Sequence, residues 1–301
     1  MNSRPSAKIK YMGEFKVPGS AVGKRADVFV AEKYPEFTRS SLERLFDKEY
    51  VSMSGQPVKP SHKLKRGEVI SVNEALLRQQ PALVKLPVIY EDKNVIVIDK
   101  PEGVLSHSKG AMNEESTVAS FIASKLSPEM AGNRAGIVHR LDRATSGLII
   151  TARNPAAQTK LQKQFSQRKT KKTYTAIVEG IPELMQAVIE APIERNPKKP
   201  QTFRVNIEGK SATTEYKVLK SFKRDGVDYS QLELKPLTGR THQLRVHLSY
   251  IGHPIVGDRL YGHEGKHLYL HASQLELTLP SSERRVFNSP LPDYFKKFLP
   301  V

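Results

Sequence analysis

Residues 138–148 read Val-His-Arg-Leu-Asp-Arg-Ala-Thr-Ser-Gly-Leu, a polar stretch with Asp142 at its centre. Apolar runs stand on both sides of it, at 135–138 and at 148–152. Short apolar runs bounded by turn-forming residues are typical of buried strands, so we predict a polar loop that joins two strands. A carboxylate between two arginines is costly to place at a strand end, and such groups serve chemistry more often than packing. The loop is therefore the first candidate for an active site.

The bulk composition narrows the class of protein. The chain has 301 residues, enough for about two domains, and 38% of them are apolar, which is ample for a packed core. No apolar run approaches the ~20 residues of a membrane span, and the N-terminus lacks the apolar stretch of a signal peptide. Cysteine is absent, which excludes disulfides, thiolate metal sites and a cysteine nucleophile. We expect a cytoplasmic protein with no membrane partner.

The charge of the chain is strongly positive. It contains 48 Lys and Arg against 31 Asp and Glu, a formal net charge of +17. A surplus of this size favours nucleic acid as the partner, because neutralised phosphates release counterions. An anionic membrane is the alternative partner, and it is disfavoured because no basic amphipathic helix or lipidation motif is evident.

The first part of the chain divides into three segments. Residues 1–22 are polar and contain prolines and glycines, so we predict a flexible leader. Residues 23–73 form a compact α+β unit, whose expected helices and strands are 26–33, 38–46, 50–53 and 68–72. Thr38 or Ser40 can cap the second helix. Residues 74–86 have mixed composition and form a linker.

The unit at 23–73 resembles the S-four-type RNA-binding domain, which is named after a small-subunit ribosomal protein. The matching segments are Arg25-Ala-Asp27, Thr38-Arg-Ser-Ser-Leu42, Tyr50-Val51 and Lys65-Arg-Gly-Glu-Val-Ile70, whereas Met53-Ser-Gly55 replaces the usual Val-Asn-Gly. Residues 1–86 contain 16 basic and 9 acidic side chains, a net charge of +7. The resemblance implies RNA binding through basic residues, among them Arg39 and Arg44. The alternative is a small α+β domain whose arginines are only solvated.

Residues 87–301 alternate strand-like and helix-like segments and form the second domain. The expected strands are 94–99, 147–152, 172–178, 212–219 and 229–234, and the expected helices are 117–124, 155–167 and 241–250. Polar and apolar residues alternate within 173–178 and 213–219, as expected of a sheet covered on one face. We therefore predict an α+β fold with a mixed, largely antiparallel sheet and flanking helices.

Four segments contain more polar and glycine residues than packing alone explains. They are 99–107, the Asp142 loop, 168–174, and 237–247 with 251–258 after it. In the expected helix at 241–250, Arg245 emerges beside the apolar stripe of Leu244 and Leu248, and an arginine so placed needs an anion. Asp142 is the natural partner, because an adjacent guanidinium keeps a half-buried carboxylate ionised. On these residues alone, a purely structural ion pair is equally consistent.

Together these segments resemble the RluA-type family of RNA pseudouridine synthases over nearly all of residues 88–277. Two segments match the family's signatures: His139-Arg-Leu-Asp-Arg-Ala-Thr-Ser-Gly147 and Thr238-Gly-Arg-Thr-His-Gln-Leu-Arg-Val-His247. The others match in the right order: Lys100-Pro-Glu-Gly103 with His107, Lys172-Thr-Tyr174, and Gly252-His-Pro-Ile-Val-Gly-Asp258. An N-terminal S-four-type domain is a common attachment in this family.

The resemblance implies roles for individual residues. Asp142 matches the family's essential aspartate, Tyr174 the tyrosine that contacts the target base, and Arg245 the basic residue that pairs with the aspartate. Arg140 matches a residue that helps to occupy the space left by the extruded nucleotide. The other residues of this domain expected to contact RNA are His139, Arg143, Lys172, Arg240, Lys100 and His107. We expect a monomer that needs no cofactor and no metal.

The chemistry of pseudouridylation suits these residues. The reaction breaks the N1–C1′ bond of a uridine, turns the uracil and forms a C5–C1′ bond. A carboxylate can assist by attacking C1′, as in retaining glycosidases, or by removing a ribose proton to give a glycal, and both routes stay open. A stacked base must first be extruded, and Tyr174 offers a ring on which the flipped uracil can stack. Seven basic and no acidic residues lie from Arg153 to Tyr174, which predicts a phosphate-facing strip; a solvated helix is the alternative.

One motif points to a different chemistry. The segment His263-Glu-Gly-Lys-His267 fits a zinc pattern that works on a helix, where two histidines share a face. Gly262 and Gly265 disfavour a helix, so we expect a loop followed by a strand. Three functions remain: a synthase acting on large-subunit ribosomal RNA, a synthase acting on transfer RNA, and a catalytically silent RNA-binding assembly factor. The presence of Asp142, Tyr174 and Arg245 together favours an active enzyme.

Overall fold

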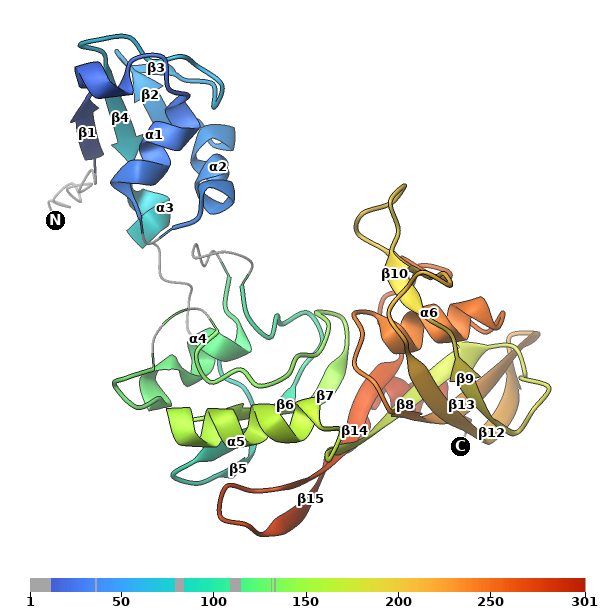
Figure 1. Cartoon of the computed structure of the whole chain (residues 1–301). Coiled ribbons are helices and arrows are strands. Elements are labelled where there is room, and N and C mark those ends of the chain that lie inside the picture. Colours follow the sequence, from blue (N-terminus) through green and yellow to red (C-terminus); the bar gives the residue numbers. More distant parts are fainter. Residues whose placement is uncertain are drawn as a thin grey trace, which may run out of the picture. The chain divides into compact units, whose positions relative to one another are not determined.

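The protein is described by a computed structural model for residues 12–35, 37–78, 84–108, 115–130, 132 and 134–300. The chain separates into two compact units, one of residues 1–83 with 107–116 and one of residues 84–106 with 117–301 (Figure 1). Within the described ranges, no helix is long and apolar enough to cross a membrane.

The N-terminal unit is a four-stranded antiparallel sheet packed against helices. Its strands pair in the order β1 (Met12–Lys16), β4 (Val69–Asn73), β2 (Val51–Met53) and β3 (Gln56–Pro57). Its helices are α1 (Ala26–Lys33), α2 (Arg39–Asp47) and the short α3 (Ala75–Arg78). The fully buried side chains of Phe29, Leu42 and Ile70 join helices and sheet in one core.

Most elements expected in this unit are confirmed. The side chain of Thr38 caps α2 by accepting a hydrogen bond from the N–H of Ser41 at 3.3 Å. The prediction of a flexible leader over residues 1–22 is wrong from residue 12 onward, because β1 pairs with β4 along its whole length. A five-residue strand that contains a glycine gives a weak sequence signal, and its partner lies far along the chain. Residues 1–11 of the expected leader lie outside the described residues.

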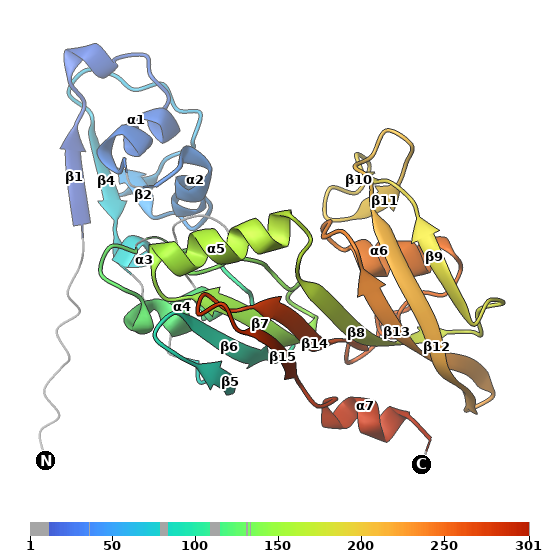
Figure 2. The ribbon, with the colours of Figure 1, turned by 60° about the horizontal axis from the view of Figure 1, so that its bottom comes forward.

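The larger unit is built on a nine-stranded mixed sheet (Figure 2). Its strands pair in the order β5 (Val88–Glu91), β6 (Val95–Lys100), β7 (Ser146–Ala152), β14 (Leu270–Thr278), β8 (Lys171–Glu179), β13 (Val227–Pro236), β12 (Thr213–Arg224) and β9 (Gln186–Glu190), with β15 (Arg284–Asn288) also beside β14. Strands β7 and β14 pair in parallel, and the other described neighbours are antiparallel. The predicted α+β fold with a mixed, largely antiparallel sheet is confirmed.

Helices cover the two halves of this sheet separately. The helices are α4 (Val118–Ile122), α5 (Pro155–Ser166), α6 (Gln243–Tyr250) and α7 (Asp293–Phe298), and a small hairpin is formed by β10 (Ile193–Arg195) and β11 (Phe203–Val205). Helix α5 packs on the half that contains β7 and buries Leu161 there. Helix α6 packs on the half that contains β12 and β13 and buries Leu248 (Figure 2). Strand β14 lies where the halves meet.

The contact between β7 and β14 depends on Gly147. Its φ is +109°, and an added Cβ would lie 2.3 Å from the carbonyl oxygen of Ala272 on β14. Glycine alone permits so close an approach of two backbones in this conformation. Because Gly147 lies where the Asp142 loop runs into β7, this contact fixes the end of the loop at the boundary between the two halves.

One expected strand is wrong. Residues 134–136 form a turn, in which Gly136 has a φ of +76°, and Ile137 makes a single isolated bridge with Thr151. A four-residue apolar run cannot distinguish a strand from a turn whose side chains point inward, and Ile137 does pack on the core. The other strands and helices expected in this unit are present, with ends shifted by a few residues.

Candidate active site

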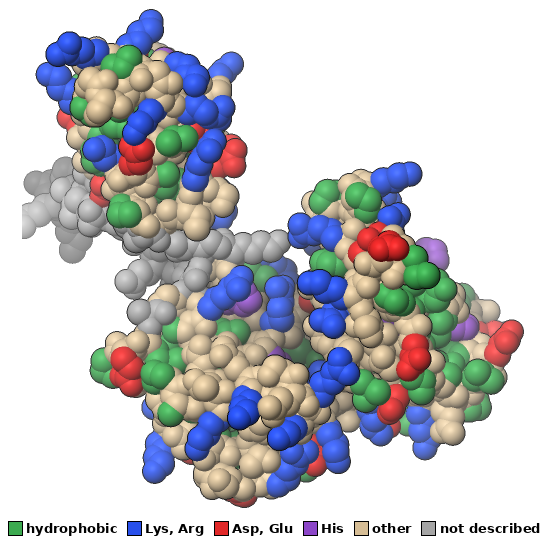
Figure 3. Space-filling view, viewed as in Figure 1, with side chains coloured by type: hydrophobic (Ala, Val, Ile, Leu, Met, Phe, Trp, Pro, Cys, Tyr) green, Lys and Arg blue, Asp and Glu red, His purple; other side chains and the backbone are tan. Residues whose placement is uncertain are grey.

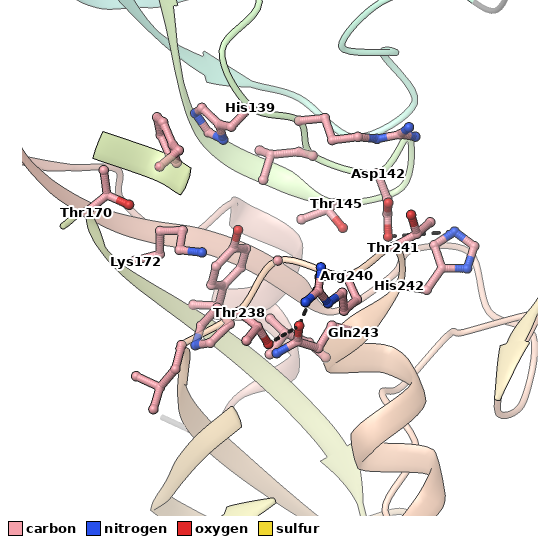
Figure 4. A pocket seen from close by; sticks show the side chains of 18 of the residues that line it. His139, Asp142, Thr145, Thr170, Lys172, Thr238, Arg240, Thr241, His242 and Gln243 are labelled. Atoms are coloured by element: carbon pink, nitrogen blue, oxygen red, sulfur yellow. Dashed lines mark hydrogen bonds and ion pairs between the residues drawn. The ribbon is translucent and has the colours of Figure 1, made fainter. Parts of the chain in front are cut away.

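A pocket of about 460 Å³ lies between the two halves of the larger unit (Figure 4). Its walls are the Asp142 loop, the end of α5, the start of β8, and the segment that runs from the end of β13 into α6. The arginines and lysines that line it are Arg140, Arg168, Lys172, Arg240 and Arg245. Among the described residues that line the pocket, Asp142 is the single carboxylate. An anionic ligand therefore meets an excess of positive charge here.

The backbone on both sides of Asp142 is held by the segment that follows β6. The hydroxyl of Ser106 donates to the carbonyl oxygen of Leu141 at 2.9 Å and accepts from the N–H of Leu141 at 3.0 Å. The N–H of Gly103 donates to the carbonyl oxygen of Arg143 at 2.8 Å. The neighbours of Asp142 are thus fixed on either side, and its carboxylate has a defined position.

Lys100 holds the same loop from inside the protein. Its side chain is fully buried, and its amino group donates to the carbonyl oxygens of Pro101, Val104 and Arg143 at 2.9, 2.9 and 3.3 Å. Burial lowers the pKa of Lys100 to about 7. The sequence predicts that Lys100 contacts RNA, and this is wrong in the structure, because its amino group points inward and supports the Asp142 loop.

The Asp142 carboxylate faces two basic side chains of the α6 segment. Its Oδ2 lies 3.6 Å from Nη1 of Arg245 and 3.9 Å from Nε2 of His242, toward which it points in Figure 4. The Asp142 side chain is 17% exposed, so it is reached from the pocket and is otherwise enclosed. The ion pair expected between Asp142 and Arg245 is present, although the two groups are not in hydrogen-bond contact.

The closer partner of Arg245 is Asp258. This residue ends the polar segment 251–258, and the sequence alone predicts no role for it. Nε and Nη2 of Arg245 donate to the two oxygens of Asp258 at 2.7 and 2.6 Å. The ring of Tyr261 lies 5.1 Å from the guanidinium carbon. Burial acts to lower the pKa of Arg245, but the hydrogen bonds to Asp258, together with the negative charges of Asp258 and Asp142, outweigh burial and raise that pKa. Arg245 is therefore a fixed cation beside Asp142.

His242 precedes α6 in a backbone conformation that is rare for a residue with a side chain. Its φ is +57°, in the left-handed region, where such strain is often found at functional sites. Nδ1 of His242 lies 2.7 Å from the hydroxyl of Tyr261, which accepts a hydrogen bond from the N–H of Phe203 at 2.8 Å. The Tyr261 hydroxyl can then donate to Nδ1, which leaves the ring proton on Nε2, facing Asp142. Burial lowers the pKa of His242.

His139 supports the wall of the pocket next to α5. Its ring stacks on Phe165, with centroids 4.5 Å apart, and its Nε2 accepts a hydrogen bond from the N–H of Ile150 at 3.0 Å. Burial, together with the nearby charge of Lys172, lowers the pKa of His139 to about 3. The neutral ring of His139 accepts a hydrogen bond from the backbone and therefore has a structural role. The contact with RNA that the sequence predicts for His139 stays a prediction.

Tyr174 lies in β8 and packs against the cores of both halves of the sheet. Burial, with the charge of Asp142, raises the pKa of the Tyr174 phenol, so the side chain is neutral near pH 7. Lys172 lies on the same strand, and burial lowers its pKa. The pocket thus combines a neutral aromatic ring with a carboxylate and several cations.

Most of the predicted site residues converge on this pocket. Those that line it are Asp142, Tyr174, Arg245, His139, Arg140, Lys172 and Arg240. Arg143 is exposed and, like His107, does not line the pocket. Arg39 and Arg44 belong to the N-terminal unit, where Nη2 of Arg39 binds Asp27 at 2.8 Å. The sequence assigns no individual role to Asp258 or Tyr261, because neither belongs to the signature segments around Asp142 and Arg245, whereas Arg168 falls in the predicted phosphate-facing strip.

The predicted basic strip from Arg153 to Tyr174 is wrong at its first residue. Nε of Arg153 donates to the carbonyl oxygen of Lys125 at 3.0 Å, and Nη1 donates to that of Asp92 at 2.7 Å. Nη1 also lies 3.2 Å from Glu91. The guanidinium of Arg153 therefore joins parts of the fold and does not face solvent phosphate.

The zinc-like motif does not form a shared site. His263 and His267 lie in the loop before β14, as expected, and have different carboxylate partners, Glu179 at 2.8 Å and Glu102 at 2.9 Å. In the part of the chain that the structure describes, no group of three or more His, Asp or Glu side chains could hold a metal ion.

The pocket presents one carboxylate among several cations, an arrangement that suits an enzyme acting on a polyanion. The family of RNA pseudouridylate synthases matches residues 94–250, just over half of the chain. This chain belongs to the RNA pseudouridylate synthase family, and it is an isomerase that acts on RNA.

Individual relatives agree with this assignment. An uncharacterised RNA pseudouridine synthase of Aquifex aeolicus is 40% identical over 261 residues, which cover 85% of this chain and 81% of the relative. The ribosomal large subunit pseudouridine synthase D of Borreliella burgdorferi is 35% identical over 313 residues, covering 97% and 93%. That of Xanthomonas campestris is 39% identical over 249 residues, covering 82% and 73%. The solved structure of human RNA pseudouridylate synthase domain containing 1 is similar with a TM-score of 0.59 and 29% identity, covering 71% of this chain and 86% of its own.

Proposed function

We propose that this enzyme isomerises specific uridines of large-subunit ribosomal RNA and that Asp142 is its catalytic carboxylate. The observation that supports the second part most is the place of Asp142, the single carboxylate among the described residues that line the pocket. The names of the relatives from Borreliella burgdorferi and Xanthomonas campestris support the RNA target. We also propose that the enzyme is a monomer of the cytoplasm that works without a cofactor.

The surroundings of Asp142 suit either route of glycosidic cleavage. Both routes need an ionised carboxylate, one to attack C1′ and the other to remove a ribose proton. Nη1 of Arg245 lies 3.6 Å from the Asp142 carboxylate and places a positive charge beside it. When the uracil re-attaches through C5, the hydrogen on C5 leaves and N1 gains a proton, so the overall reaction is an isomerisation. The C5 hydrogen that is lost to solvent gives a direct measure of turnover.

The other walls of the pocket suit a flipped nucleotide. The neutral ring of Tyr174 can stack on the extruded uracil without competing as an anion. Arg140, Lys172 and Arg240 line the pocket and can contact the phosphates on either side of that nucleotide. Arg140 is exposed, as expected of a side chain that enters the space left in the RNA stack.

The N-terminal unit is proposed to be an S-four-type RNA-binding domain. The buried carboxylate of Asp27 accepts hydrogen bonds from Arg25 at 2.9 and 3.1 Å and from Arg39 at 2.8 Å. The hydrogen bonds from Arg25 and Arg39 lower the pKa of Asp27 to about 2, so this carboxylate keeps both arginines in place at neutral pH. Their side chains are 40% and 54% exposed and can bind phosphate. Deleting residues 1–86 should weaken RNA binding and flatten its salt dependence, and unchanged affinity would contradict this role.

The proposed function is tested by mapping pseudouridines in cells with and without the gene. Carbodiimide-dependent primer extension over ribosomal and transfer RNA should show at least one large-subunit uridine that loses its modification in the deletion strain. The wild-type gene should restore that modification, and an Asp142→Asn gene should not. A loss confined to transfer RNA would contradict the target, and restoration by the Asn variant would contradict the role of Asp142.

A further inference from the structure

A second hollow of the larger unit lies beside α5. It has a volume of about 510 Å³ and lies between α5 and the turn that joins β14 to β15. Its basic side chains are Lys160, Lys163, Lys169 and Arg284, and no acidic side chain lines it among the residues that the structure describes. Figure 3 shows lysine and arginine side chains gathered on this face. We name this hollow the α5 groove.

The charge of the α5 groove comes mainly from its lysines. Arg284 is paired with Glu276 at 2.9 Å and is largely neutralised. Among the described residues, no carboxylate forms an ion pair with Lys160, Lys163 or Lys169, and all three side chains are exposed. Three cations that converge on one hollow without a counter-charge favour an anionic ligand with several charges.

The walls of the groove are fixed in the absence of a ligand. The side-chain amide of Gln164 donates to the carbonyl oxygen of Thr278 at 2.6 Å and accepts from the N–H of Thr278 at 3.0 Å, which ties α5 to β14. At the other end, Nη1 of Arg284 donates to the carbonyl oxygen of Lys169 at 3.1 Å. Lys160 and Lys163 lie three residues apart on α5 and share one face. The lysines therefore stand on a rigid frame, and binding needs little reordering.

The groove and the catalytic pocket are separated only by the end of α5. Ser166 and Arg168 line the pocket, whereas Gln167 and Lys169 line the groove. This alternation arises because the helix ends there and Arg168 takes a left-handed conformation, with a φ of +56°. A single strand that leaves the pocket can pass this turn and meet the lysines of the groove.

We propose that the α5 groove binds the sugar-phosphate backbone of the substrate RNA next to the flipped uridine. The inference rests on the proposed action of the enzyme on ribosomal RNA and extends its RNA contacts beyond the pocket. Lysines without a paired carboxylate act as point charges for phosphate and give no base selectivity. The groove therefore contributes affinity and orientation, while the pocket performs the reaction.

The test uses the full-length enzyme and an in vitro transcript of large-subunit ribosomal RNA that carries tritium at C5 of uridine. The double variant K160E/K163E should raise the Kd for this RNA about tenfold and reduce the slope of log Kd against log salt by about 1.4, the value for two contacts with single-stranded phosphates. The rate of tritium release at saturating RNA should not change. The neutral pair K160Q/K163Q should show the same loss of slope with a smaller loss of affinity.

The matched control is K217E/K220E on β12, which makes the same change of net charge on exposed side chains separated from β14 by β8 and β13. It should leave the Kd and the salt slope near the wild-type values. Equal effects of the two charge-reversal pairs would overturn the proposal, as would a lower saturating rate at unchanged Kd. If the wild-type enzyme releases no tritium from this RNA, the proposed function itself fails, whatever the variants do.

Discussion

Asp258 binds the guanidinium of Arg245 through two hydrogen bonds of 2.6 and 2.7 Å, and the remaining nitrogen of that guanidinium faces Asp142 at 3.6 Å. The arginine beside Asp142 is therefore fixed by a second, fully buried carboxylate. A cation that is oriented before the substrate arrives stabilises charge without reorganisation during the reaction.

The first prediction concerns this buried pair. Asp258→Asn leaves Arg245 without its main partner, and breaking a buried ion pair on one side costs about 3–5 kcal/mol of the free energy of unfolding. Chemical denaturation measures this loss. Glu32→Gln, which removes one partner of the exposed pair with Lys24, serves as the control and should cost at most about 1 kcal/mol. A similar loss of unfolding free energy in the two variants would contradict the prediction that the buried pair stabilises the fold more than the exposed pair does.

The second prediction concerns the junction of β7 and β14. Gly147→Ala places a Cβ 2.3 Å from a backbone oxygen and should cost more than about 4 kcal/mol, or prevent folding. Gly226→Ala is the matched control, because Gly226 also has a positive φ, +81°, but its Cβ would meet nothing within 4 Å. Gly226→Ala should lower the unfolding free energy by only about 1–2 kcal/mol, which is the cost of a left-handed backbone for a residue with a side chain. Thermal unfolding of both variants distinguishes steric clash from backbone strain.

The third prediction concerns pH. His139 has a pKa lowered to about 3 in the folded protein, against an ordinary value of 6.5. Between these values the unfolded chain binds a proton that the folded chain does not, so stability falls as the pH falls from about 6.5 toward 3. His139→Phe removes this titrating group. As the pH is lowered, the unfolding free energy of the variant should therefore fall less steeply than that of the wild type, and the two slopes should differ by up to about 1.4 kcal/mol per pH unit. Parallel curves of unfolding free energy against pH for the wild type and the variant would contradict the prediction that His139 is buried and neutral.

The fourth prediction concerns Tyr261, whose hydroxyl connects Phe203 to His242. Tyr261→Phe leaves the N–H of Phe203 without its acceptor and should cost about 1–3 kcal/mol of stability. His242 also loses the contact that orients its Nε2 toward Asp142, so the single-turnover rate should fall by up to about a hundredfold. The Kd for RNA should stay unchanged. A higher Kd at an unchanged rate would assign Tyr261 to binding and contradict the positioning role.

The sequence predicts the fold of the larger unit well, because its strands and helices have clear periodicity. The alternation within 213–219 matches the alternating burial of β12, whereas residues 175–178 of β8 are all buried because this strand lies in the middle of the sheet. The errors occur where the local signal is weak. Strand β1 is short and depends on pairing with β4, and the apolar run at 135–138 begins in a turn and packs inward.

The sequence predicts most of the residues that line the candidate site. It does not predict the residues that hold them in position. Asp142 and Arg245 belong to the two signature segments and Tyr174 to another matching segment, and the structure brings all three to one pocket. The burial of Lys100 and the pairing of Asp258 with Arg245 depend on how distant loops fold, which residue spacing does not reveal. Sequence patterns thus identify candidate site residues more readily than the residues that hold them in place.

On the proposed function, Asp142 performs the chemistry in the basic pocket. The most direct measurement is single-turnover tritium release from C5-labelled large-subunit ribosomal RNA, with the Kd for the same RNA measured in parallel. Asp142→Asn keeps the size of the side chain and the surrounding backbone contacts, so it should bind this RNA with the wild-type Kd and release no tritium. Tritium release by Asp142→Asn at a rate near that of the wild-type enzyme would contradict the account.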